Sequence, residues 1–138
     1  MNLAYPMSIE TPLPVGDFID RLTILDIKAE RVDDPVKLRN IEHERAALRQ
    51  TWSDSTYFGA SIEGEQRELK SVNAELWEVE DRIRIKERRG EFDREFIALA
   101  RSVYRLNDRR AQVKRAINLK LGSDLIEEKS YHGQGASQ

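Results

Sequence analysis

Two stripes of polar and aromatic side chains could do chemistry in this sequence, because each repeats at the spacing of one helix face. One stripe lies in residues 62–89 and the other in residues 94–121. Each is displaced by about one position from a row of apolar residues at helical spacing, which we call the apolar seam. Arg110 interrupts the seam of the second segment. Arg and Lys side chains of this kind can grip a carboxylate or a phosphate. The predicted anion-binding or polar cluster consists of Lys70, Asn73, Trp77, Asp81, Arg84, Arg101, Tyr104, Asp108, Arg110 and Lys114.

The same stripes also suit a purely structural pair of helices. Positions beside the apolar seam of packed helices commonly carry paired charges. Trp and Tyr commonly occupy half-buried positions at the edge of such an interface. The two interpretations differ in geometry, since a site would gather the charges around one concave pocket and a structural shoulder would pair them along a convex surface. In an antiparallel hairpin that turns near Gly90, Arg101 would face Asp81, and Trp77 would neighbour Tyr104.

Other catalytic chemistry lacks its residues. The chain has no Cys, so disulfides and thiolate catalysis are excluded, and its two histidines, His43 and His132, form no cluster with other metal ligands. The sequence "GQG" at 133–135 has no strand before it and no helix after it, as a phosphate-binding loop requires. Acyl-transfer chemistry would need a serine held near a histidine base, and nothing in the sequence suggests one. We therefore expect no metal and no cofactor.

The charge is unevenly distributed along the chain. The 138 residues carry a net charge of −2, but residues 82–120 contain 13 basic and 5 acidic residues. A basic segment in an otherwise acidic chain can indicate an anionic partner. It can equally attract the acidic part of the same helical bundle. The acidic balance elsewhere and the lack of interleaved aromatic residues argue against nucleic acid. No apolar stretch is long enough to span a membrane and no leader is visible, so we expect a soluble, cytoplasmic protein.

Apolar periodicity predicts an all-α fold in a single domain, residues 1–131. A long antiparallel hairpin (62–89 and 94–121) forms its base, and two shorter helices (16–32 and 35–52) pack on it. Asp34 and Asp93 are predicted N-caps, whereas Gly90 and Gly122 suit helix ends. Residues 1–14 are predicted to form an extended strap, with a short strand possible at 8–13. Residues 123–131 could add a helical turn, and 132–138 form a disordered tail.

The lengths of these helices predict an assembly. At about 1.5 Å per residue, each hairpin helix spans about 42 Å and each shorter helix about 27 Å, so the shorter pair leaves part of the hairpin seam uncovered. A second copy would cover it, and we expect a homodimer. Arg110 lies in the seam between Leu106 and Val113, where an unpaired charge is costly. We expect its partner among Asn73, Glu75 and residues of the first helix, such as Asp20 or Asp26.

Four segments resemble a family of small bacterial helical proteins known only as a domain of unknown function. They are "VGDFIDRLTILDIKAERV", "ELKSVNAELWEVEDRIRIKERRGEF", "FIALARSVYRLNDRRAQVKRAINLKLGS" and "EEKSY", and the resemblance spans Ser8 to Tyr131. It implies a fold and assigns no chemistry. Besides the cluster above, the matching motifs contain Asp20, Thr23, Lys28, Asn107, Asn118, Glu127, Glu128, Lys129 and Tyr131.

A shorter likeness concerns the first helix alone. "FIDRLTILDIKAER" resembles the first helix of all-helical chorismate mutases, with Asp20 and Arg31 at the matching positions, but "DDP" ends this helix where those enzymes continue. We therefore expect a non-enzymatic protein that interacts with itself or with another protein. The alternative is a small helical enzyme or sensor that binds an anionic metabolite.

Overall fold

The computed structural model describes residues 8–130, which contain four α-helices and no strand. They are α1 (Val15–Arg31), α2 (Pro35–Asp54), α3 (Glu63–Arg89) and α4 (Arg94–Leu121). The predicted all-α fold with a long helical hairpin is confirmed. The strand considered at 8–13 and the helical turn considered at 123–131 are wrong as far as the described residues reach, because both stretches are coil there. The predicted tail at 132–138 lies outside the described residues.

Local signals set the helix ends where the sequence places them. The Asp34 side chain accepts hydrogen bonds from two backbone N–H groups in the first turn of α2, and Pro35 occupies the first helical position. Asp93 accepts one from the first turn of α4 at 3.0 Å. Gly90 and Gly122 end α3 and α4 in the left-handed region, with φ of 65° and 64°.

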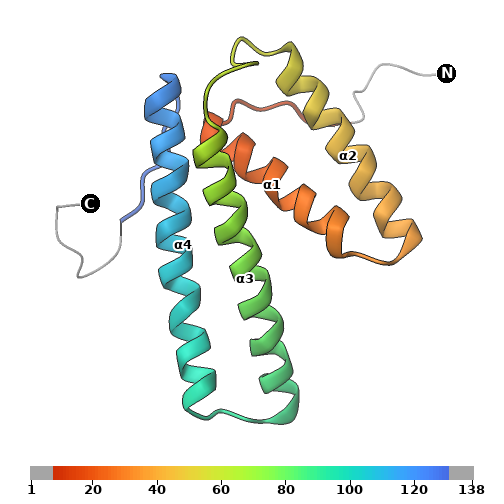
Figure 1. Cartoon of the computed structure of the whole chain (residues 1–138), viewed down its shortest axis with the longest axis vertical. Coiled ribbons are helices and arrows are strands. Elements are labelled where there is room, and N and C mark those ends of the chain that lie inside the picture. Colours follow the sequence, from red (N-terminus) through yellow and green to blue (C-terminus); the bar gives the residue numbers. More distant parts are fainter. Residues whose placement is uncertain (1–7, 131–138) are drawn as a thin grey trace.

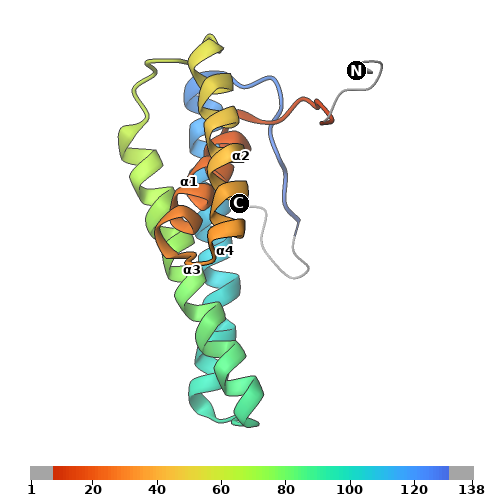
Figure 2. The same ribbon diagram turned by 90° about the vertical axis from the view of Figure 1, so that its right-hand side faces the viewer.

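The arrangement of the helices divides the hairpin into two halves (Figures 1 and 2). Helix α1 lies across the half of the α3–α4 hairpin that is remote from the connection at residues 90–93, and it contacts all three other helices. Helix α2 packs on α1 and contacts neither hairpin helix within the described chain. We call the half under α1 the proximal half and the half toward residues 90–93 the distal half. No other helix of the described chain covers the distal half.

The main core lies under α1, in the proximal half. Ile19 of α1, Leu69 of α3 and Ile117 of α4 are almost completely buried together. Phe18 of α1 stacks on Trp52 of α2 with ring centroids 6.0 Å apart, and this contact joins α2 to the core. The fold therefore depends on α1, because it is the only helix between α2 and the hairpin in the described chain.

A glycine allows the first turn of α1 to approach α4 closely. A Cβ placed on Gly16 would lie 2.3 Å from the backbone oxygen of Lys114, which no side chain can tolerate. The Gly16 N–H donates to Oδ1 of Asn118 at 2.6 Å, and Asn118 is almost completely buried. This contact fixes the height of α1 on the hairpin.

The uneven charge of the chain is used within the fold. Five basic residues of the segment 82–120 form ion pairs with carboxylates outside that segment. The pairs are Arg109–Glu68, Arg110–Asp20, Lys114–Asp17, Arg115–Glu128 and Lys120–Glu65. Attraction between parts of one chain therefore accounts for much of the asymmetry that could also have indicated an anionic partner.

Candidate functional site

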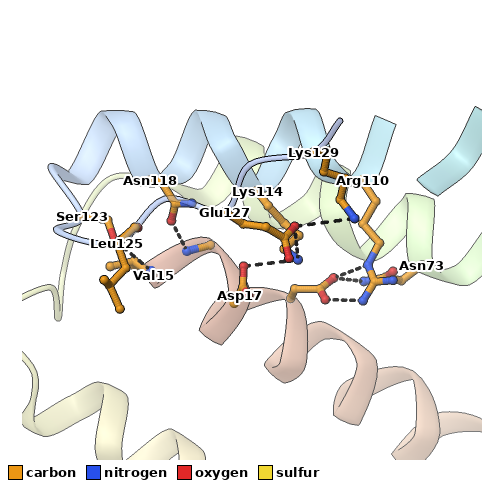
Figure 3. Close-up of polar contacts among 12 residues, drawn as sticks. Val15, Asp17, Asn73, Arg110, Lys114, Asn118, Ser123, Leu125, Glu127 and Lys129 are labelled. Carbon is orange, nitrogen blue, oxygen red and sulfur yellow. Dashed lines mark hydrogen bonds and ion pairs between the residues drawn. The ribbon is translucent and has the colours of Figure 1, made fainter. Parts of the chain in front are cut away.

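A hydrogen-bonded network joins α1 to the hairpin in the proximal half (Figure 3). Asp20 of α1 is 5% exposed, and its carboxylate accepts two bonds from the guanidinium of Arg110, one of them from Nε at 2.9 Å. Asn73 of α3 donates to Asp20 Oδ1 at 2.8 Å and to Thr23 Oγ1 at 2.9 Å. The Thr23 hydroxyl donates to the backbone oxygen of Asp20 at 2.8 Å. We call Asp20, Thr23, Asn73 and Arg110 the crossing network.

The crossing network confirms the expectation that Arg110 has a polar partner. Hydrogen bonding to Asp20 raises the pKa of Arg110 above its usual value, with the desolvation of the half-buried guanidinium opposing this effect. The bidentate geometry satisfies both carboxylate oxygens of Asp20. Since each member has a hydrogen-bonding partner inside the protein, the network holds the helices in register.

A second ion-pair system lies one helical turn away, around Lys114. The Lys114 ammonium is 3.2 Å from Asp17 Oδ1 and 3.5 Å from Glu127 Oε1 (Figure 3). Glu127 belongs to the stretch 123–130 after α4, which we call the C-terminal strap. The strap is attached near the start of α1, where Ser123 Oγ accepts a hydrogen bond from the Val15 N–H at 3.3 Å.

An open cavity of about 560 Å³ lies between α1 and α4, next to both systems. Its walls contain four cationic side chains, three carboxylates and three apolar side chains. They are Arg21, Lys28, Arg110 and Lys114; Asp17, Asp20 and Glu44; and Leu13, Ile24 and Leu25. The cavity therefore combines a small excess of positive charge with an apolar wall.

The structure does not gather the ten predicted site residues in one pocket. Asn73 and Arg110 belong to the crossing network, and Lys114 to the neighbouring ion-pair system. Lys70 pairs with Glu30 and Arg84 with Glu80, both on the surface. Trp77 and Asp108 are half-buried. Asp81, Arg84, Arg101 and Tyr104 are exposed on the distal half.

The predicted contacts between the stripes are not formed within one chain. Neither Asp81 nor Arg101 makes an ion pair with any residue in the range 8–130, although both are placed there. Tyr104 carries the guanidinium of Arg105 over its ring at 5.8 Å, and none of the aromatic pairs among the described residues joins it to Trp77. The purely structural interpretation of the stripes requires every charge to be paired. Around Asp81 and Arg101 this condition is not met within the described chain.

Sequence reasoning missed several residues that shape the cavity. Asp17, Arg21 and Lys28 line the cavity but were not among the ten predicted residues. A signal was present, because Asp17, Arg21 and Lys28 recur at helical spacing along α1. The boundaries of this helix were predicted from its apolar residues, and its polar residues were considered only as partners of Arg110 and as positions in the two resemblances.

The distal half exposes apolar side chains that two helices cannot enclose. Phe92 is 58% exposed, Ile97 46% and Tyr104 56%, and Ile85 is also exposed. On α4, Ile97, Arg101 and Tyr104 follow one another at intervals of four and three residues, which places them on one side of the helix. We call Ile97, Arg101 and Tyr104, together with the exposed Asp81 of α3, the distal patch.

The two residues that resemble chorismate mutase positions have separate partners. Arg31 pairs with Glu78 of α3, whereas Asp20 is held by Arg110 and Asn73. The two residues are eleven positions apart on α1, which separates them by about 16 Å along the helix axis. They do not converge on one binding site.

The fold and these contacts define a small all-helical protein with one internally paired polar centre and one uncovered surface. Residues 7–137 match the family of unknown function DUF6165, and the chain belongs to this family. No curated protein and no solved structure matches the chain. None of the helices in the described range is long and apolar enough to cross a membrane. Among residues 8–130, no group of three or more His, Asp or Glu side chains is placed to hold a metal ion.

Proposed function

We propose that this chain is a non-enzymatic assembly protein that forms a homodimer through the distal half of its hairpin. The observation that carries the proposal is the set of exposed apolar side chains at Phe92, Ile97 and Tyr104, which no other part of the described chain covers. A helical pair buries its seam from one side only, and a third surface is needed to complete the core. A second copy supplies that surface by symmetry.

Helix length supports the same arrangement. The 17 residues of α1 span about 26 Å, whereas α3 and α4 with 27 and 28 residues each span about 40 Å. Helix α2 packs on α1 and not on the hairpin, so α2 does not cover the part of α3 and α4 that extends beyond α1. The uncovered part coincides with the distal patch.

Charge complementarity supports a second copy as the partner. Asp81 and Arg101 carry opposite charges and are unpaired within the described chain. In a two-fold symmetric dimer, Asp81 of one copy and Arg101 of the other form a pair that occurs twice. Such pairs at an interface fix the register of the partners while the apolar groups contribute most of the affinity.

Sedimentation equilibrium and light scattering test the proposal directly. At protein concentrations near 100 μM we expect a particle of twice the 16.0 kDa chain mass, because a weak apolar interface corresponds to a Kd of about micromolar. Tyr104→Glu places a charge in the patch and should give a monomer. Leu119→Glu is the matched control, since Leu119 is similarly exposed on α4 but lies in the proximal half. A wild-type monomer at this concentration, or equal effects of the two variants, would overturn the proposal.

A mixing experiment tests the pairing of Asp81 with Arg101. Asp81→Arg and Arg101→Asp should each weaken the homodimer, because each brings like charges together across the interface. When the two variants are mixed, both contacts become complementary and a heterodimer should form. If the mixture stays as dissociated as its components, Asp81 and Arg101 do not meet across an interface.

A further inference from the structure

We infer that the cavity between α1 and α4 is a binding site for a small organic carboxylate with an apolar body, and that Glu127 competes with this ligand for Lys114. The inference concerns the proximal half and does not depend on self-association. It rests on the charges that line the cavity, on the weak contact made by the strap, and on the apolar side chains that line the cavity beside the cations.

The cavity has cationic groups that the protein does not fully use. Among the four cations that line it, Arg21 pairs with Glu44 and Arg110 with Asp20. Lys114 pairs with Asp17 of the lining and with Glu127, which lies outside the lining. Lys28 lines the cavity and makes no ion pair with any residue in the range 8–130. A ligand carboxylate would neutralise the remaining charge.

Arg110 retains donors that can reach a ligand. Its Nε and Nη2 atoms bind Asp20, and Nη1 donates to no described residue. Because the bidentate contact with Asp20 fixes the plane of the guanidinium, its remaining N–H groups are held in place at the cavity wall without further loss of side-chain freedom. Arg110 thus has a positioning role toward α1 and free donors toward the cavity.

The contact between Glu127 and Lys114 is one that an anion can displace. Lys114 is 12% exposed, so its ammonium is largely removed from solvent, whereas Glu127 is 38% exposed and 3.5 Å away. Glu127 also lies 3.7 Å from Lys129 of the same strap (Figure 3). Ion pairs with a long N–O distance and one solvent-exposed partner contribute little to the free energy of unfolding. The strap carboxylate therefore acts as an internal substitute for the ligand.

The wall and the size of the cavity define the body of the ligand. Leu13, Ile24 and Leu25 line the cavity together with the charged groups, and its volume of about 560 Å³ is within the range of small-molecule sites. Inorganic phosphate would leave these apolar side chains in contact with water. A carboxylate on an aliphatic or aromatic body contacts both kinds of wall.

Isothermal titration calorimetry with hexanoate as the probe tests the inference on the full chain. We expect hexanoate to bind with a Kd of about millimolar, and hexanamide, which lacks the charge, to bind much more weakly. Lys28→Met should weaken hexanoate binding about fivefold while the melting temperature stays unchanged, because Lys28 has no ion-pair partner to lose within the described chain. Inorganic phosphate should bind more weakly than hexanoate, since it cannot use the apolar wall.

Two neighbouring strap variants separate competition from a general effect of charge. Glu127→Gln should strengthen hexanoate binding about two- to fivefold by freeing Lys114. Glu128→Gln is the matched control, because Glu128 pairs with Arg115, which does not line the cavity. The inference is overturned if wild type and Glu127→Gln both fail to bind hexanoate, or if the two strap variants bind it equally. It is likewise overturned if phosphate or hexanamide binds as tightly as hexanoate.

Discussion

The proximal and distal halves of the hairpin have cores of different kinds. In the proximal half, α1 covers the seam, and Leu69 and Ile117 are completely buried. In the distal half the same two helices continue without a cover, and Ile97 and Tyr104 are about half exposed. The comparison shows that the apolar periodicity of a helix does not determine how deeply its residues are buried. Leu99 is 5% exposed although no third helix covers it, but other seam residues toward the connection, such as Ile83 and Val103, are only half-buried, because α1 covers only part of the hairpin.

Polar contacts are distributed just as unevenly. The proximal half contains the buried crossing network, whose members are linked across sequence separations of 50 to 90 residues. The ion pairs toward residues 90–93 join residues close in sequence, and their carboxylates are exposed, although Lys86 is 12% exposed. We therefore expect substitutions in the proximal half to cost far more stability than those in the distal half.

The largest expected effect is that of Gly16→Ala. The new Cβ would meet the backbone oxygen of Lys114 at 2.3 Å, and because backbone cannot turn aside as a side chain can, α1 must move off the hairpin. We expect a loss of about 4 kcal/mol or more in the free energy of unfolding, measured by urea denaturation. Gly64→Ala is the control, since its Cβ meets nothing within 4 Å, and it should stabilise the protein slightly. Similar values for both would show that α1 does not approach α4 closely.

Removing the guanidinium of the crossing network should have the next largest effect. Arg110→Met leaves the Asp20 carboxylate buried without its charged partner, and we expect a loss of about 3 kcal/mol. Arg109→Met is the adjacent control, because the Arg109–Glu68 pair is largely exposed and contributes less than about 1 kcal/mol. Urea denaturation of both variants should separate them clearly, and equal losses would contradict the assignment of Arg110 to the core.

A matched pair of leucines compares the cores of the two halves. Leu69→Ala in the proximal half should cost about 3 kcal/mol, whereas Leu99→Ala toward the connection should cost about 2 kcal/mol, because its surroundings are free to collapse. Urea denaturation at a protein concentration low enough to exclude dimers gives both values. If the cost of Leu99→Ala equals or exceeds that of Leu69→Ala, the two halves do not differ in the way described.

The smallest expected effect concerns acid stability in the distal half. Lys86 lowers the pKa of Asp93, and Arg82 together with Lys86 lowers that of Glu95. A lowered carboxyl pKa adds stability at pH values above the unfolded pKa, and this stability is lost as the pH falls through the folded pKa. Lys86→Met should therefore flatten the decline in melting temperature below about pH 4.5. An unchanged decline would mean that these pairs contribute nothing.

Local sequence signals predicted the helices because each end depends on neighbouring residues. Asp34 with Pro35, Gly90, Asp93 and Gly122 all act within one turn of their own position, and the structure confirms each of them. The expectation that Arg110 needs a polar partner also followed from local reasoning, since a charge in an apolar seam must be neutralised. The sequence supplied Asp20 as one of several partners without deciding between them.

Long-range contacts could not be predicted in the same way. The approach of Gly16 to α4 joins residues about 100 positions apart, and a glycine at a helix start is equally consistent with a simple N-cap. Two further features also depend on the packing of whole helices and not on neighbouring residues. One is the packing of α2 on α1 alone. The other is the path of the C-terminal strap, which brings Glu127 to Lys114. The predicted site was therefore divided among the crossing network, the ion pairs of Lys114, separate surface pairs and the distal patch.

Backbone amide hydrogen exchange at two protein concentrations is the most direct test of the difference between the halves. At high concentration we expect slow exchange throughout α3 and α4. On dilution below the dimer dissociation constant, amides around Ile83 and Leu99 should exchange much faster, while those around Leu69 and Ile117 should stay protected by α1. Protection that is equal in both halves and independent of concentration would contradict the account, because it would mean that the distal half needs no partner.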